Sequence, residues 1–316
     1  MKRIKPVVML ALTALLVASL GLSGCAGVVG SKEVTLTPVV TVPVVGQDGV
    51  LRVGIDTTNA PFAGRSNSEI IGIDVDIAAD LATQLGLRLE LTDIAGQDPD
   101  ALLEAGSVDV VMGLEPDESH LYRSHLVGPY LLDGPAIFTV QLSNEPEPFS
   151  INNLVGATVA AQQNSLSSWK VGELIGANAV QSYPSLDSAF DDLANGLVSY
   201  AASDAIVGSF LAVNYKNVTC VGLLDNPLGA YMGVASTNLE LGDALTAALR
   251  RIRDNGELKV LVTKWLGPVS TSVVISEQAI VASGGTAGAG NPVVVNEQST
   301  DAGDDLPDPS LADSAQ

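Results

Sequence analysis

Strand-like and helix-like segments alternate along residues 51–267, and this alternation restricts the fold more than any other feature of the sequence. The stretch 51–56 reads LRVGID, a buried strand, and 74–86 carries apolar residues at helical spacing before a closing glycine. The pattern restarts after Asn152 with a second run of strands and helices. Repeated βα units form parallel or mixed sheets covered by helices on both faces. The sequence therefore predicts an α/β protein of two lobes, divided near residues 138–152.

Polar residues follow the predicted strands at four places, Asp56–Asn59, Gly113–Arg123, Asn164–Ser165 and Ser203–Asp204. In open α/β sheets, ligands bind beyond the carboxyl ends of the strands. We therefore expect these four places to line any ligand site. The second of them is the most highly charged, because three acidic residues there run up against His120 and an arginine.

Composition excludes several classes of function. The formal charge of −21 argues against nucleic acid as a partner, because phosphate binding needs a basic face. Metal-ligand spacing is absent, since the only two histidines, His120 and His125, are five residues apart in a predicted loop. Cys220 lies in an apolar run and is predicted to be a buried, inert thiol. We predict no cofactor, no metal site and no catalytic residue.

The N-terminus carries a targeting pattern. A basic start, MKRIK, precedes a short apolar run, and Leu22–Cys25 reads LSGC, which resembles a bacterial lipobox. We predict a signal peptide over residues 1–24, cleavage before Cys25, and acylation of its sulfur, which would anchor the chain to the outside of the cell membrane. The alternative is an uncleaved membrane helix, although the apolar run is shorter than the roughly 20 residues that a span needs.

Both ends are predicted to lie outside the folded body. Residues 25–47 contain prolines and little charge, which predicts an extended tether between lipid and domain. Residues 269–316 contain no lysine, arginine, histidine or aromatic residue, which predicts a mostly disordered acidic tail. Within that tail, the stretch TSVVISEQAIV could pair locally with the body.

Longer stretches carry a resemblance to a known family. LRVGIDTTNAPF and IIGIDVDIAADLATQLGLRLEL are similar to its opening strand, loop and first helix. VGATVAAQQNSLSSW is similar to its second lobe, and LTAALRRIRDNGELKVLVTKWLG to its closing helices. Over Leu51–Gly267 the chain thus resembles the family 3 extracellular solute-binding proteins of ABC transporters, of the polar amino acid type.

The resemblance implies a two-lobe, periplasmic-binding-protein-like fold of type II, with mixed sheets flanked by helices and two hinge strands between the lobes. The crossings would fall near Ala136–Gln141 and Gly229–Val234. Lobe 1 would comprise residues 48–137 and 233–268, and lobe 2 residues 138–232. A monomer would enclose a small polar solute, such as an amino acid or a related amine or peptide, by hinge closure and deliver it to an ABC permease.

Two residues of the second lobe take their roles from the resemblance. Asp204 occupies the place of an aspartate that binds the ligand's α-ammonium group through charge-assisted hydrogen bonds. Ser165 stands where the family meets the ligand's carboxylate at a helix N-terminus. Asn164 replaces the usual glycine there and tolerates the left-handed backbone. Either Asp204 or Ser165 could instead only cap its own helix.

The first lobe departs further from the family. In DTTNAPF, Asp56 is kept and Asn59 replaces an aromatic ring, and both are predicted to face the cleft. Asp117 and His120 fall on the family's threonine and on the arginine that clamps the ligand carboxylate. Neutral histidine cannot make arginine's forked pair, and Arg123 could substitute only if the loop is rebuilt.

These departures suggest a hypothesis about the ligand. The acidic residues of the second loop would repel an anion. A more positively charged ligand, such as a basic amino acid, an amine or a peptide N-terminus, would be received by Asp56, Glu115, Asp117 and Asp204. The alternative is a solvated acidic loop with a histidine at its rim.

Two other classes of function stay open. A surface adhesion or signalling protein could use the same fold after losing amino-acid binding, which the missing arginine clamp favours and Asp204 disfavours. A few members of this superfamily are dehydratases, and Glu115 or Asp117 with His120 could form an acid–base pair. We nevertheless predict a binding protein and not an enzyme.

Overall fold

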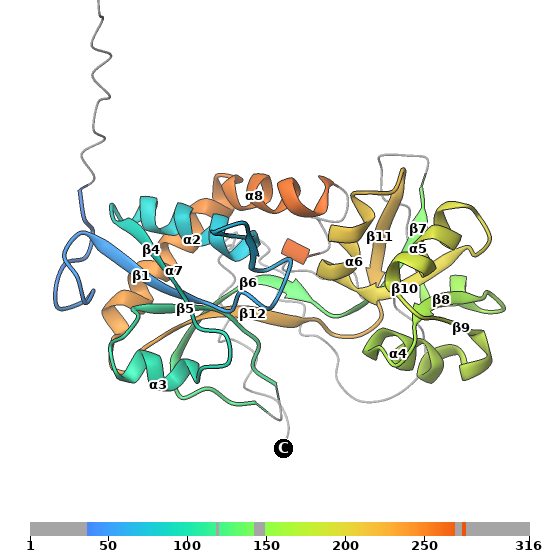
Figure 1. Ribbon diagram of the computed structural model, residues 1–316, viewed down its shortest axis with the longest axis horizontal. Helices are drawn as coiled ribbons and strands as arrows, with labels where there is room; N and C mark the ends of the chain where they lie inside the picture. Colours follow the sequence, from blue (N-terminus) through green and yellow to red (C-terminus); the bar gives the residue numbers. More distant parts are fainter. Residues whose placement is uncertain (1–36, 118–119, 142–148, 269–273, 276–316) are drawn as a thin grey trace, which may run out of the picture.

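A computed structural model describes residues 37–117, 120–141, 149–268 and 274–275, and it contains two lobes side by side (Figure 1). The five strands of the first sheet, in spatial order, are β4 (Arg88–Asp93), β1 (Val50–Ile55), β5 (Val110–Leu114), β12 (Leu228–Val234) and β6 (His125–Asp133). The second sheet runs β11 (Val218–Leu223), β7 (Pro135–Val140), β10 (Tyr200–Asp204), β8 (Val159–Gln162) and β9 (Val180–Tyr183).

Both sheets are mixed. In the first, β1 is parallel to β4 and β5, whereas β12 is antiparallel to β5 and β6. In the second, β8 is parallel to β9 and β10, whereas β7 is antiparallel to β10 and β11. The predicted two-lobe α/β architecture with mixed sheets is therefore confirmed.

Helices flank each sheet. In the first lobe these are α2 (Ile73–Gln84), α3 (Pro99–Glu104), α7 (Leu239–Asp254) and α8 (Glu257–Leu266), and a small hairpin of β2 (Gly64–Ser66) and β3 (Glu69–Ile71) precedes α2. In the second they are α4 (Leu166–Ile175), α5 (Leu186–Ala194) and α6 (Ala205–Ala212), with short 3-10 turns η1 (Ile151–Leu154) and η2 (Ala177–Ala179). Among the described residues, none of these helices has both the length and the apolar character needed to span a membrane.

Helix α2 illustrates how the sequence pattern becomes packing. Its apolar residues Ile73, Ile77 and Leu81 recur at helical spacing and are fully buried. The helix starts at Gly72, whose φ of 150° and close approach to the backbone oxygen of Phe62 leave no room for a side chain. This glycine therefore sets where α2 enters the lobe.

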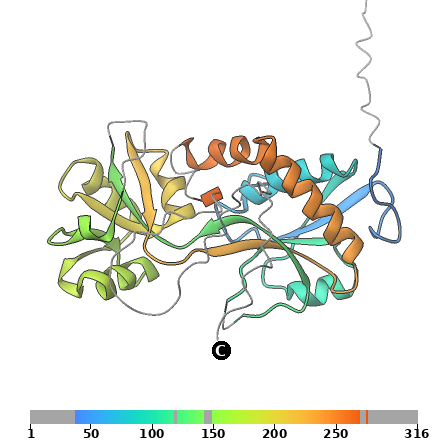
Figure 2. The ribbon, with the colours of Figure 1, turned by 180° about the vertical axis from the view of Figure 1, so that it is seen from behind.

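The chain crosses between the lobes twice (Figure 2). The first crossing is Gly134, between β6 and β7, and the second is residues 224–227, between β11 and β12. The crossings expected near Ala136–Gln141 and Gly229–Val234 instead lie inside β7 and β12. Turn signals stand at both true boundaries, Gly134-Pro135 and Asn226-Pro227, but such signals do not distinguish a turn within one sheet from a crossing between two. The lobes also meet where α6 packs against α8, with the rings of Phe210 and Trp265 6.3 Å apart.

Residues 37–47 differ from the expected extended tether, because they pack on the first lobe. Val40 and Val45 are buried in its core, and the backbone oxygen of Val44 accepts a hydrogen bond from the side chain of Asn238. The rest of the predicted tether and signal peptide, with Cys25, lies outside the described residues. Of the predicted acidic tail, Val274 is fully buried in the same core, and residues 276–316 lie outside the description.

A buried ion pair fastens the 37–47 segment to the first sheet. The carboxylate of Asp109 accepts hydrogen bonds from the guanidinium of Arg52 and from the backbone N–H of Gly46 and of Arg52. The Asp109 side chain is 5% exposed and that of Arg52 is 18% exposed. Removing one partner of a buried pair leaves an uncompensated charge.

We therefore expect Asp109→Ala to lower the free energy of unfolding by about 3–5 kcal/mol, measured by urea denaturation. Glu173→Ala is the matched control and should cost less than about 1 kcal/mol, because Glu173 is exposed and its partner Lys170 on α4 keeps a second ion pair with Asp225. Equal effects of the two substitutions would contradict this account of the segment.

Candidate functional site

Carboxylates from both lobes approach one another beside the crossings. Glu115 follows β5 in the first lobe, and Asp204 ends β10 in the second. Burial raises the pKa of Glu115, and the negative charge of Asp204 raises it further. This coupling indicates that the two carboxylates lie within electrostatic range across the gap between the lobes. Two of the predicted site residues, one from each lobe, therefore stand at strand ends where the charge of one acts on the other, and their contact with a ligand stays a prediction.

Asp204 is half-buried, and α6 begins directly after it, yet its side chain does not cap that helix. Its Oδ1 accepts a hydrogen bond of 2.9 Å from the hydroxyl of Ser167 in the first turn of α4. The interpretation of Asp204 as a simple helix cap is therefore wrong for its side chain. Ser167 was missed by the sequence analysis because it looks like an ordinary residue in the first turn of a helix.

Asp133 caps α6 instead. Its Oδ1 accepts hydrogen bonds from the backbone N–H of Ile206, at 3.0 Å, and of Gly134, at 2.8 Å. Burial raises the pKa of Asp133 to about 7, and the charges of Asp204 and Glu115 contribute in the same direction. The sequence analysis did not include Asp133 in the site. The signal that could have found it is the acid immediately before the crossing glycine, in LLDGP.

The N-terminus of α4 is capped by the chain itself. The hydroxyl of Ser165 accepts a hydrogen bond from the N–H of Ser168, at 3.1 Å, and donates one to the backbone oxygen of Gln162, at 2.8 Å. Asn164 has a φ of 60°, so the expected left-handed backbone is confirmed at this position. Ser165 thus serves as a helix cap, and its contact with a ligand stays a prediction.

In the acidic loop after β5, the basic residues are bound within the loop and to α3. Asp117 and His120 bind each other through their backbones, and the ring of His120 lies 4.8 Å from that of Tyr122. The guanidinium Nε of Arg123 lies 3.3 Å from Glu104 and 3.7 Å from Asp100, both on α3. Arg123 therefore does not take the place of a carboxylate clamp in this arrangement. Asp117 and His120 are exposed at the surface of the loop.

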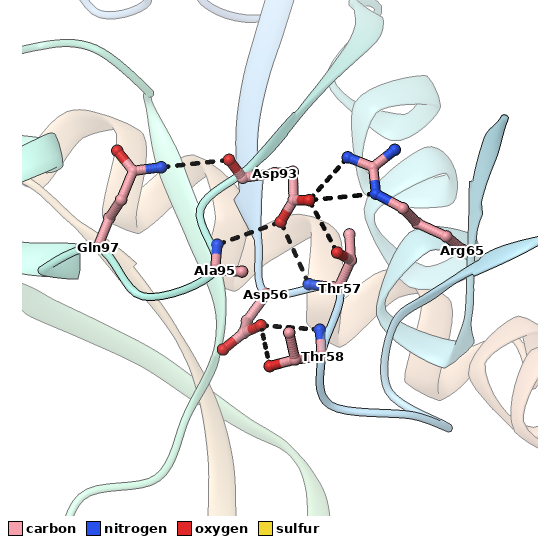
Figure 3. Close-up of polar contacts among 7 residues, drawn as sticks. All are labelled: Asp56, Thr57, Thr58, Arg65, Asp93, Ala95 and Gln97. Carbon is pink, nitrogen blue, oxygen red and sulfur yellow. Dashed lines mark hydrogen bonds and ion pairs between the residues drawn. The ribbon is translucent and has the colours of Figure 1, made fainter.

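The opening loop after β1 forms its own hydrogen-bonded cluster (Figure 3). Asp56 accepts hydrogen bonds from the N–H and the hydroxyl of Thr58, at 2.9 and 2.6 Å. Beside it, Asp93 binds the hydroxyl of Thr57 and the guanidinium of Arg65, which lowers the pKa of Asp93. Asp56 and Asn59 are both exposed, and no described contact joins them to Glu115 or Asp204.

A buried hydrogen bond supports the strand that ends at Glu115. The hydroxyl of Tyr130 donates to Asp74 Oδ1 at 2.8 Å and accepts from the N–H of Gly113 at 2.9 Å. Burial raises the pKa of Asp74 to about 7; the hydrogen bond from Tyr130 opposes this rise, and the charge of Glu115 adds to it. The end of β5 is therefore held by Tyr130, which also binds Asp74, a carboxyl group whose neutral form is favoured by burial.

The geometry suits a cation. In the part of the chain that the structure describes, no basic side chain forms an ion pair with Glu115, Asp133 or Asp204. The same described residues contain no cluster of acidic, histidine or cysteine side chains that could hold a metal ion. Burial raises the pKa of the Cys220 thiol to about 12, which agrees with the predicted inert cysteine. An organic cation between the lobes would relieve the repulsion among these carboxylates.

Comparison with known proteins gives a consistent assignment. A sequence model of the bacterial extracellular solute-binding proteins, family 3, matches residues 51–268. The arginine-binding extracellular protein ArtP of Bacillus subtilis (strain 168) is 26% identical over 223 residues, which are 68% of this chain and 85% of that protein.

Solved structures share the fold. A polar amino acid ABC uptake transporter substrate binding protein from Streptococcus thermophilus superposes with a TM-score of 0.60 and 19% identity, covering 70% of this chain and 88% of that one. An ancestral cyclohexadienyl dehydratase gives a TM-score of 0.57 and 20% identity over 69% of this chain and 92% of that one. These likenesses concern the architecture of the two lobes.

The raised pKa of Asp74 predicts how the free energy of unfolding depends on pH. The neutral carboxyl is favoured in the folded state, so its stabilising effect is complete below the ordinary pKa of 3.8 and is lost as pH rises through about 7. Between pH 5 and 8 this single group should lower the free energy of unfolding by about 2–3 kcal/mol. Asp74→Asn, which keeps an acceptor for Tyr130, should remove that part of the pH dependence.

The measurement is urea unfolding of both proteins at several pH values. Because the raised pKa of Asp133 is present in both, the difference between the two curves isolates Asp74. Parallel curves for the two proteins would refute the assignment.

Proposed function

Because the chain belongs to family 3 of the bacterial extracellular solute-binding proteins, we propose that it captures a small, positively charged solute between its lobes and delivers it to an ABC permease. The solute would be an amino acid or a related amine. The protein would work as a monomer and would bind its ligand without converting it. Capture would follow the hinge closure that two lobes joined by two crossings allow.

One observation carries this proposal, namely that Glu115 follows β5 in the first lobe and Asp204 ends β10 in the second, and that no basic side chain of the described residues forms an ion pair with either. A positive group between them would make charge-assisted hydrogen bonds to both lobes at once. Asp204 is the natural receiver of an ammonium group, since Ser167 holds its carboxylate at a fixed position. Relatives support the class of ligand, because ArtP is named for arginine binding.

The proposal predicts a specific loss of affinity. We expect Asp204→Asn to weaken binding of the best cationic ligand by about 10- to 100-fold, because a hydrogen bond to a charged group contributes about 1.5–3 kcal/mol. Asp187→Asn, which removes an exposed acid from α5 in the same lobe, is the matched control and should leave affinity unchanged. Isothermal titration measures both, after a melting-temperature screen of amino acids and amines has identified the ligand.

The same screen separates the alternatives. Ligand at a hundredfold excess over Kd should stabilise a binding protein by about 2.7 kcal/mol. An adhesion or signalling protein that had lost the site would show no shift with any of these solutes. An enzyme of the dehydratase type would consume its ligand, whereas a binding protein would release it unchanged in mass spectrometry.

We further propose that Cys25 is acylated and anchors the chain to the outside of the membrane. Cys25→Ser should move the protein from the membrane fraction to the soluble fraction and remove the mass of the lipid. Cys220→Ser is the control, because Cys220 is the only other cysteine and is buried in β11, and it should stay with the membrane. A Cys25→Ser protein that remains in the membrane would indicate an uncleaved helix.

A further inference from the structure

We propose that the aromatic rings of Phe210 and Trp265, here called the interlobe pair, stabilise one relative position of the two lobes in the protein without ligand. This inference goes beyond the proposed function, because it concerns the lobes before any solute binds. Three observations support it. Each ring stands on a helix that is fixed in its own lobe, a carboxylate of the first lobe orients Trp265, and the contact lies apart from the crossings.

Helix α8 is fixed in the first lobe. Its residues Leu258, Val262 and Leu266 recur at helical spacing and are buried in the core of that lobe. Trp265 is only partly buried against the same core. Its ring therefore stands at the border of the first lobe, where part of its surface is open to a neighbour.

Asp76 fixes the orientation of that ring. The indole Nε1 of Trp265 donates a hydrogen bond to Asp76 Oδ2 at 2.7 Å, and the ammonium of Lys264 donates to the same oxygen at 2.6 Å. Asp76 lies in the first turn of α2, so these bonds join α8 to another helix of the same lobe. A side chain that is already held in place loses less conformational entropy when it makes a further contact.

Helix α6 is fixed in the second lobe in a different way. Gly208 packs so closely against the ring of Phe138, on β7, that a side chain at this position would clash. Phe210, two residues later, is 40% exposed, and its ring centroid lies 6.3 Å from that of Trp265. Aromatic rings attract one another at this distance. Phe210 thus presents a ring from the second lobe to the ring that Asp76 holds in the first.

The interlobe pair lies apart from the two crossings. In both views of the molecule, α6 and α8 lie above the crossings (Figure 1, Figure 2). A hinge motion about the crossings therefore changes the distance between α6 and α8, and with it the contact between the rings. A contact that is complete at only one lobe position stabilises that position relative to all others. The interlobe pair thus favours the lobe position in which its rings meet.

Distances between spin labels on the two lobes test this inference without any ligand. Thr83→Cys on α2 and Leu197→Cys after α5 place labels at exposed positions, and Cys25→Ser leaves the buried Cys220 as the only other cysteine. Double electron–electron resonance of the labelled full chain gives the distribution of interlobe distances. Phe210→Ala should lower the ratio of the main population to all others by about 3- to 10-fold, which is the effect of one aromatic pair.

Two further variants separate the ring contact from other effects. Trp265→Phe keeps a ring opposite Phe210 but cannot donate to Asp76, so it should change the distribution in the same direction by a smaller factor. It also serves as the second variant if Phe210→Ala does not fold. Trp169→Ala is the matched control, because it removes a 69% exposed ring from α4 of the second lobe, and it should leave the distribution unchanged.

Two outcomes would overturn the inference. One is a distribution that stays the same as that of the native chain in every folded variant of the interlobe pair. The other is a change with Trp169→Ala as large as that with Phe210→Ala, since the effect would then not depend on a contact between the lobes. Because no solute is added, either outcome would leave the proposed function standing.

Discussion

The hydrogen bonds of Asp133 join the three parts of this molecule on which the site depends. One carboxylate oxygen accepts from Gly134, the residue at which the chain leaves the first lobe, and from Ile206, in the first turn of α6. The backbone oxygen of Gly134 in turn accepts from the N–H of Ala205. The crossing and the start of α6 are therefore fastened to one another, and Asp204, immediately before that helix, is placed beside the crossing.

This arrangement places acidic side chains beside the first crossing between the lobes. A carboxylate that caps a helix is stabilised by the N–H groups it accepts, yet burial and the neighbouring acids still raise the pKa of Asp133 to about 7. Burial and the charge of Asp204 likewise raise the pKa of Glu115. The carboxylates thus stay close without neutralisation by any described basic side chain, and the acids that hold the crossing together are also those that a cation would stabilise.

Much of the fold could be predicted from sequence, because the apolar runs of β1, β5 and α2 have clear periods. The predicted crossings lie a few residues too far along, inside β7 and β12, although Gly134-Pro135 and Asn226-Pro227 mark turns at the true boundaries; a turn signal alone does not show that the chain changes sheets there. Residues 37–47 looked like a linker by composition, yet a few valines suffice to dock them. Of the site, Asp204 and Glu115 were found as acids after strands, whereas Asp133 and Ser167 act through tertiary contacts that local patterns do not contain.

The same electrostatics gives a physical reason for closure around a ligand. A ligand shifts an equilibrium between open and closed lobes only by its difference in affinity for the two. Without a cation, moving Glu115 toward Asp204 increases like-charge repulsion and disfavours closure. With a cation between them, closure would become favourable, because only the closed arrangement would let both lobes bind the cation. Because Asp133 ends β6 directly before the crossing at Gly134 and also binds the first turn of α6, a change of charge near it would act where the two lobes join.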